Sequence, residues 1–301
     1  MLDTRVNTFL AVCHTLNYTH AARALNLTQS AVSQHMAHLE RAYGAKLVAI
    51  EGKSMRLTEE GRLLQRAFQS FAHDEALLKR RIAAVSSDET VHLKVGMTLT
   101  AGEYIVAPAL ARFMKKNPRM RVTVASRSTE ELLDLMGRGL IDCAFLEGFF
   151  EKDAFSWDRL CEQELVCVCA PGHPLARRGC CCMEDLLDIP LIVREEASGS
   201  RAVLEHALRR RNLAIASFSD IVEVSSIGII KAFVEADLGI SFVYEAAVAS
   251  ELSSGRLARV AIEGDAIVHD ISFVRLKSSV FENDFKALFK GVGGEFEKLG
   301  R

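Results

Sequence analysis

The first 85 residues follow short helical and strand-like patterns and then one long helical pattern. Apolar side chains recur three and four positions apart over 4–16 and 17–40, which predicts short amphipathic helices. Two short apolar segments, 46–50 and 55–57, predict a small β-hairpin. Residues 59–85 keep a single apolar stripe, and they would form a helix roughly 40 Å long. A small domain cannot bury that stripe, so we expect this helix to pair with its copy in a second subunit.

From residue 91 onward, strand-like and helical segments alternate, which is typical of a parallel α/β fold. A capping box, Ser128 with Glu131, opens one of the helices. The alternation continues beyond residue 160, so we predict two similar α/β lobes joined by a crossover. The predicted strands cover residues 91–97, 121–125, 141–146, 165–169, 191–193, 221–224, 240–243 and 267–274, and the predicted helices cover 101–116, 129–138, 201–211, 227–236 and 281–299.

Residues 17–40 are interpreted as two helices joined by a tight turn at Asn26 and Leu27, with Thr28 as the N-cap of the second helix. The polar side chains of that helix then face outward, where amides and hydroxyls can bond base edges or phosphates. This is the layout of a helix-turn-helix with the recognition helix second, although an ordinary helical hairpin with a polar outer face has the same spacing. The hairpin that follows is either a wing on the DNA or a solvent-facing element. The residues predicted to contact DNA are Thr28, Gln29, Ser30, Ser33, Gln34 and His35, together with Lys53 and Arg56 of the wing.

Charge is distributed unevenly along the chain. Residues 1–58 carry six Lys or Arg against three Asp or Glu, a net charge of +3, whereas the whole chain has a net charge of −2. A basic head on an acidic body suits DNA binding, because phosphate contacts supply most of the nonspecific affinity. No apolar run approaches the ~20 residues that span a bilayer, and the N-terminal apolar stretch is interpreted as a helix and not as a signal peptide. We therefore expect a cytoplasmic protein without membrane contact.

The eight cysteines include three in succession at 180–182. No pair has the C-x-x-C spacing, and no histidine cluster completes a zinc site. Single cysteines of this kind usually fill apolar space, and a redox or metal role for the triplet stays open as an alternative. The sequence shows no nucleophile with a positioned base. We predict no catalytic residue, no metal ion and no cofactor.

Hydroxyl side chains follow three strands of the α/β body where helices are about to begin. Ligands of open α/β lobes bind beyond the carboxyl ends of the strands, and hydroxyls beside free helix amides form an anion cradle. Glu147 falls in the same region, so the bound molecule is either anionic or carries an amine. The alternative is that the hydroxyls only cap their helices. The residues predicted to bind a small-molecule effector are Thr98, Thr100, Glu147, Ser198, Gly199, Ser200 and Ser226.

Six short motifs are spread over the chain: Ala21-Ala22, Gln29-Ser30-Ala31-Val32-Ser33, Leu39-Glu40, Leu57-Thr58-x-x-Gly61, Gly139-Leu140-Ile141-Asp142 and Pro171-Gly172-His173-Pro174-Leu175. Together they resemble those of the LysR-type transcriptional regulator (LTTR) family. In the family the recognition helix is usually followed by Leu-Phe-x-Arg, whereas this chain has Leu47-Val48-Ala49-Ile50 and lacks the arginine that commonly contacts DNA.

The resemblance implies a winged helix-turn-helix over 1–58, a dimerising linker helix and hinge over 59–89, and a two-lobed, periplasmic-binding-protein-like effector domain over 90–301. Lobe I would comprise about 90–160 and 268–301, and lobe II about 161–267. It also implies a homodimer or homotetramer on double-stranded promoter DNA, with a small molecule between the lobes that changes promoter occupancy. The competing class is an enzyme or solute-binding protein of similar α/β fold.

Overall fold

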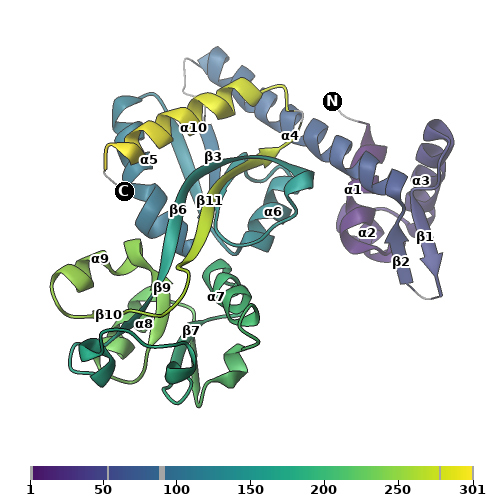
Figure 1. Cartoon of the computed structure of the whole chain (residues 1–301). Helices are drawn as coiled ribbons and strands as arrows, with labels where there is room; N and C mark the ends of the chain where they lie inside the picture. The colour runs from purple at the N-terminus through teal and green to yellow at the C-terminus, as the bar shows by residue number, and fades with distance from the viewer. Residues whose placement is uncertain (1–2, 53, 88–91, 278, 300–301) are drawn as a thin grey trace.

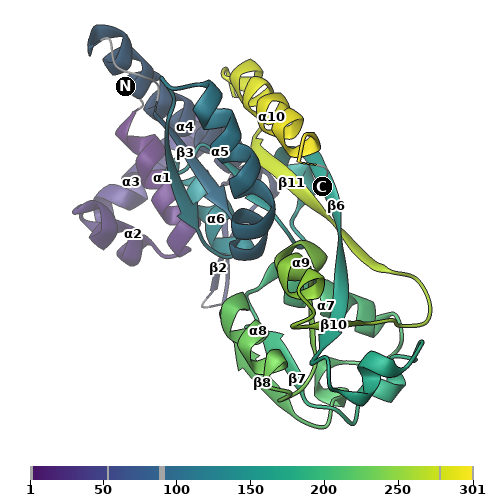
Figure 2. The same cartoon turned by 90° about the vertical axis from the view of Figure 1, so that its left-hand side faces the viewer.

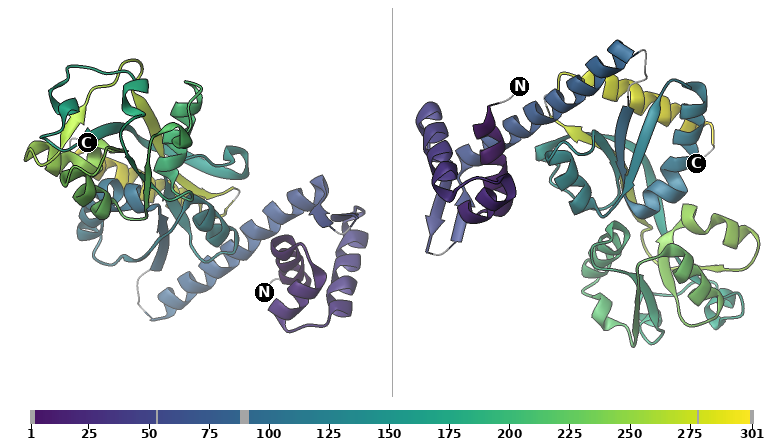
Figure 3. Two further views of the ribbon diagram at one scale, coloured as in Figure 1. Left: turned by 90° about the horizontal axis from the view of Figure 1, so that it is seen from below. Right: turned by 180° about the vertical axis from the view of Figure 1, so that it is seen from behind.

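The computed structural model describes residues 3–52, 54–87, 92–277 and 279–299 (Figure 1). Lys53, one of the predicted wing contacts, lies outside these ranges. Figures 1 and 3 show a small N-terminal head, the long helix α4 as a bridge, and a body of two lobes.

The head is a winged helix-turn-helix, as predicted. Asn17 caps the second helix by accepting hydrogen bonds from the amides of Thr19 and His20, and the Thr28 hydroxyl accepts one from the amide of Ala31 at 3.2 Å. Gly44 ends the third helix in the left-handed conformation that glycine favours, with φ of +67°. The elements of the head are α1 (Thr4–Thr15), α2 (Tyr18–Leu25), α3 (Gln29–Tyr43), β1 (Val48–Glu51) and β2 (Ser54–Leu57).

Helix α4 (Glu59–Ser87) begins against the wing. Its N-cap is Thr58, whose hydroxyl accepts a hydrogen bond from the Gly61 amide at 2.9 Å. A Cβ at Gly61 would lie 2.1 Å from the Leu47 carbonyl oxygen, so only glycine permits this close approach. This contact explains the spacing of the Leu57-Thr58-x-x-Gly61 motif.

The apolar stripe of α4 is divided between its own chain and solvent. Leu64 and Phe68 are buried in the core of the head, and Leu77 is buried in the core of lobe I. The head and lobe I of the same chain therefore cover one side of the stripe, and the expected pairing with a second subunit concerns its other side. A second row remains exposed: Leu63, Phe71, Leu78 and Ile82.

A buried carboxylate fastens α4 to lobe I. Asp142 is fully buried, accepts a hydrogen bond from the Lys94 amide at 2.8 Å, and forms an ion pair with Arg80 of α4. His73 Nε2 lies 3.4 Å from the same carboxylate. Burial raises the pKa of Asp142, but His73, the Lys94 amide and Arg80 outweigh it and hold that pKa below its usual value. The carboxylate therefore stays ionised where the linker helix meets the body.

Lobe I is a sheet covered by helices on both faces. Strand β3 pairs in parallel with β4 and β5, and β11 joins the other side of β5 antiparallel. Figure 1 shows α5 and α10 over the sheet, with α6 and α4 on other sides. Its elements are β3 (His92–Met97), the π-helix η1 (Ala101–Val106), α5 (Ala107–Lys116), β4 (Arg121–Ser126), α6 (Thr129–Gly137), β5 (Cys143–Leu146) and α10 (Glu282–Glu297).

Two long strands, β6 (Phe155–Cys169) and β11 (Ile267–Leu276), run from lobe I into lobe II as an antiparallel pair (Figure 2). The sheet order is β10-β6-β11-β5-β3-β4, with β9 also paired to β6, while β7 and β8 form a separate parallel pair. The elements of lobe II are β7 (Leu191–Arg194), α7 (Gly199–Arg209), β8 (Ile221–Val224), α8 (Ile227–Glu235), β9 (Ser241–Tyr244), α9 (Glu245–Ser253) and β10 (Ala258–Val260), and the short 3₁₀ helices are η2 (Lys152–Ala154), η3 (Pro174–Arg177), η4 (Glu184–Leu186) and η5 (Ile215–Ser217).

Candidate functional site

The outer face of α3 is polar and open. Among the predicted DNA contacts Thr28, Gln29, Ser30 and Gln34 are exposed and Ser33 is half-buried, while Val32, Met36 and Leu39 anchor the opposite face. His35 is placed differently, because its Nδ1 lies 2.8 Å from the hydroxyl of the buried Thr8 in α1. His35 therefore joins α3 to α1.

The wing carries little unpaired charge among its described residues. Arg56 forms an ion pair with Glu51 of the same hairpin, and Lys46 at its base pairs with Glu40 at 2.6 Å. Ile50, at the position where the family usually has arginine, is 70% exposed. An apolar side chain is thus displayed where a phosphate contact is usual.

Polar side chains from both lobes meet in a buried seam, which we call the interlobe seam. It contains Thr98, Thr100 and Glu147 of lobe I and Arg194, Ser198 and Ser200 of lobe II, all at most 5% exposed. These residues follow the carboxyl ends of β3, β5 and β7, where ligands of α/β lobes bind.

Hydrogen bonds and close contacts hold the seam together across the lobes. Arg194 Nη1 donates to Thr100 Oγ1 at 3.2 Å, and the Glu147 amide donates to Thr98 Oγ1 at 3.3 Å. The hydroxyls of Ser198 and Ser200 are 3.0 Å apart at the start of α7. A Cβ at Gly199 would lie 2.7 Å from Glu147 Cγ, so glycine lets the N-terminus of α7 rest directly on that side chain.

Ser226 stands apart from the other predicted effector residues. It is half-buried at the N-cap of α8, two residues beyond Val224, which pairs with Arg194 in the β7–β8 sheet. In the described part of the chain no hydrogen bond joins its side chain to the seam. The structure thus brings six of the seven predicted residues together. Sequence reasoning left out Tyr244, whose buried hydroxyl interacts electrostatically with Glu147.

The arginines at and beside the seam form ion pairs with neighbouring acids. Arg194 binds both carboxylate oxygens of Glu195, each at 2.8 Å, and Arg201 binds Glu205 at 2.9 Å and Glu223 at 2.6 Å. Both arginines are therefore already paired with acids.

Glu147 is a buried acid of the seam whose carboxylate is not fully hydrogen-bonded. Burial raises its pKa to about 7 against the opposing effects of Arg194, Thr100 and the Ala101 amide. Among the described residues, Glu147 Oε2 and the Tyr244 hydroxyl are buried without a hydrogen-bond partner. Burial and the neighbouring Glu147 together raise the pKa of Tyr244 well above its usual value. A seam carboxylate and a buried hydroxyl that interacts with it electrostatically thus both have unused hydrogen-bonding capacity.

The cysteine triplet shows no assembled site. Cys180 is exposed, Cys181 is buried and Cys182 is half-buried, and none is in a disulfide. Over the described ranges, no group of three His, Cys, Asp or Glu side chains is arranged to hold a metal ion. Within the same described residues, no helix is long and apolar enough to cross a membrane.

Two family models of known proteins match this chain, one over the head and one over the body. The family model "Bacterial regulatory helix-turn-helix protein, lysR family" matches residues 4–62, and "LysR substrate binding domain" matches residues 86–292. The chain is 30% identical over 256 residues to the transcriptional activator CmpR of Synechocystis, covering 85% of this chain and 83% of CmpR. It is 29% identical over 281 residues to the transcriptional regulator CysL of Bacillus subtilis, covering 92% and 91%.

Solved structures share the fold, one over nearly the whole chain and one over the body. Full-length LysG of Corynebacterium glutamicum with bound effector Arg superposes with a TM-score of 0.63 at 17% identity, covering 99% of both chains. The CcmR regulatory domain of Synechocystis in complex with 2-PG superposes with a TM-score of 0.60 at 20% identity, covering 67% of this chain and 96% of that domain. On its sequence matches to the head and the body together, the chain belongs to the LysR family of transcriptional regulators.

Proposed function

We propose that the interlobe seam is the effector site of this regulator and that its effector carries an amine beside an acidic group. The observation that carries this proposal is the pair of buried atoms without a hydrogen-bond partner, Glu147 Oε2 and the Tyr244 hydroxyl. An ammonium group can donate to both, and it compensates the burial of an ionised Glu147.

The acidic group belongs at the start of α7. Ser198 occupies the N-cap without a side-chain capping bond, which leaves its hydroxyl and that of Ser200 beside the first-turn amides. An anion at such a helix N-terminus gains hydrogen bonds and the favourable end of the helix dipole. A simple anion alone fits less well, because Arg194 is already neutralised by Glu195.

Thermal stabilisation of the full chain by amino acids, amines and organic acids tests this site. Amino acids should stabilise the wild type more than amines or acids do. The double variant Thr100→Ala/Ser200→Ala should lose that stabilisation, and the exposed neighbour Ser225→Ala serves as its control. Undiminished stabilisation of the double variant would reject the seam as the site.

The DNA contact surface that we propose is the exposed face of α3. The side chains on this face that would contact the DNA are Thr28, Gln29, Ser30, Ser33 and Gln34. His35 instead positions α3, because it contacts the Thr8 hydroxyl of α1. Lys53 and Arg56 of the wing are proposed to contact phosphates. To do so, Arg56 must break its ion pair with Glu51 and form one with a DNA phosphate. A gel-shift titration with the upstream intergenic DNA tests this proposal, and the absence of salt-sensitive binding would contradict it.

We also propose that α4 joins subunits into a homodimer or homotetramer. Its exposed residues Leu63, Phe71, Leu78 and Ile82 lie within about 100° of one another around the helix axis, at 100° per residue. Each is at least 48% exposed, which leaves an apolar row suited to a partner helix. In this arrangement residues 1–58 act as the DNA-binding unit, 59–89 as the linker and 90–301 as the effector domain.

A further inference from the structure

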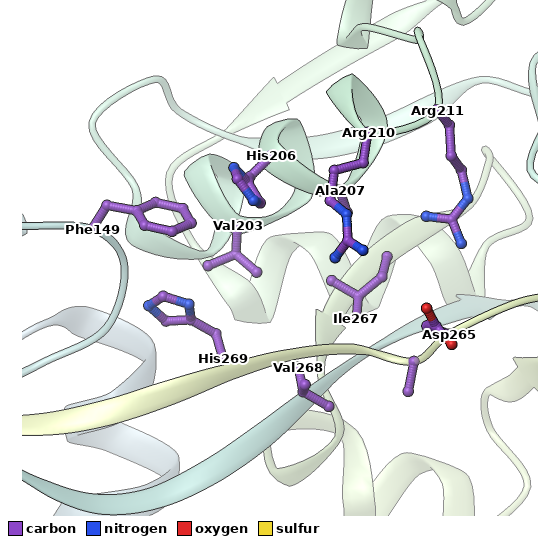
Figure 4. A pocket seen from close by; sticks show the side chains of 11 residues that line it. Phe149, Val203, His206, Ala207, Arg210, Arg211, Asp265, Ile267, Val268 and His269 are labelled. Atoms are coloured by element: carbon purple, nitrogen blue, oxygen red, sulfur yellow. The ribbon is translucent and has the colours of Figure 1, made fainter.

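A second cavity, of about 330 Å³, lies along the C-terminal half of α7 (Figure 4). Its walls come from three places: the loop after β5, the C-terminal half of α7, and the start of β11. Unlike the seam, it is open to solvent, since Phe149, His206 and Arg210 are exposed. The aromatic, cationic and apolar side chains that define the chemistry of the cavity are Phe149, His206, Arg210, Arg211, Ile267 and His269.

One side of this cavity is lined by three neighbouring aromatic rings. The ring centroid of Phe149 lies 5.1 Å from that of His206 and 4.9 Å from that of His269. His269 is held in place by the Gly148 carbonyl oxygen, 2.9 Å from its Nε2. Phe149 itself is 52% exposed, although it sits in a cavity with an apolar floor that includes Val203 and Ile267. A flat apolar group entering here would cover the exposed ring.

The other side of the cavity is cationic. Figure 4 shows the guanidinium groups of Arg210 and Arg211 directed from the end of α7 toward β11. Within the described ranges, neither guanidinium has a carboxylate oxygen within the 4.0 Å of an ion pair, in contrast to Arg194 and Arg201. Asp265 is the single acidic residue that lines the cavity. Two arginines against one acid leave an excess of positive charge with unused donors.

We propose that this cavity is a second ligand site, which takes a small aromatic anion. Its ring lies against Phe149, His206 and His269, and its phosphate or carboxylate group accepts hydrogen bonds from Arg210 and Arg211. The volume matches the lower end of the range for small-molecule sites, about 300 Å³. The lining of this cavity shares no residue with the interlobe seam, so the two sites can be changed separately.

Calorimetric titration of the full-length chain with phenyl phosphate tests the proposal. Inorganic phosphate supplies the charge without the ring, and benzyl alcohol supplies the ring without the charge. We expect phenyl phosphate to bind more tightly than either. Arg210→Gln should weaken its binding about tenfold or more, as loss of a charge-assisted hydrogen bond does. Phe149→Ala should weaken the binding of phenyl phosphate but leave the affinity for inorganic phosphate unchanged.

The control is Arg209→Gln, which removes the same charge from the neighbouring exposed position that does not line the cavity. We expect it to change the affinity less than twofold. Equal losses in Arg209→Gln and Arg210→Gln would overturn the proposal, as would an absence of phenyl phosphate binding to the wild type. Loss of binding in Thr100→Ala/Ser200→Ala with retention in Arg210→Gln would place the ligand in the seam, and this outcome also overturns it.

Discussion

Replacement of Glu147 by glutamine should remove a pH dependence of stability from the body of the protein. The carboxyl group is buried, and its pKa is raised from 4.5 to about 7. Below about pH 4.5 it is protonated in the folded and unfolded chain alike. Between about 4.5 and 7 the unfolded chain loses its proton while the folded chain keeps it, so stability falls as pH rises. Above about pH 7 both forms are ionised and the loss is complete.

The size of the effect follows from the shift. A difference of about 2.5 pKa units, at about 1.36 kcal/mol per unit, corresponds to about 3 kcal/mol. Glu147→Gln keeps the shape of the side chain and cannot ionise. Between pH 5 and pH 8 the free energy of unfolding of the variant should therefore rise by about 2.5 kcal/mol relative to that of the wild type, whatever the difference between them at pH 5.

Urea unfolding followed by tryptophan fluorescence measures this difference. The single tryptophan, Trp157, lies on β6 in the body, so the signal reports on the part that contains Glu147. Glu151→Gln, a change at an exposed carboxylate, is the control and should follow the wild type. A gap between Glu147→Gln and wild type that stays constant from pH 5 to pH 8 would refute the burial argument.

Three further predictions concern the linker helix and the wing. Asp142→Asn leaves Arg80 and His73 without their buried partner and should lower the free energy of unfolding by about 3 kcal/mol or more, which urea titration measures; a loss below about 1 kcal/mol would contradict the anchoring role. Phe71→Glu places a charge in the exposed row of α4 and should yield monomers in light scattering, whereas Arg62→Glu on another side of α4 should not; an unchanged oligomer would reject the α4 interface. Ile50→Arg should tighten DNA binding and steepen the dependence of log K on log salt by about 0.9 for one new phosphate contact; an unchanged slope would show that the wing does not reach the backbone.

Local signals predicted the head and many element boundaries. The Thr28 cap and the Ser128 capping box each act within a few residues, so the sequence alone specifies them. The helix predicted over 101–116 is less regular than expected, because its first turns form the π-helix η1. Strand β6 is three times the predicted length, since its first ten residues mix polar and apolar side chains while bridging the two lobes.

Long-range contacts were harder to foresee. Arg80 and Asp142 are 62 positions apart, and their ion pair depends on how α4 packs on lobe I. The hydroxyls of the seam were predicted because strand ends of an α/β lobe share an edge, whereas Tyr244 gave no signal, since a tyrosine ending a buried strand resembles ordinary core. Phe149, His206 and His269 form one cavity wall from three distant segments without any motif.

The most direct test of the effector-controlled regulator is DNA affinity measured with and without ligand. Fluorescence anisotropy of the full chain on labelled upstream intergenic DNA gives the dissociation constant in the presence and absence of the amino acid that stabilises the protein most. We predict that this ligand changes the constant for the wild type and leaves Thr100→Ala/Ser200→Ala unaffected, while both proteins bind DNA comparably without it. An equal response of both proteins would contradict control through the interlobe seam.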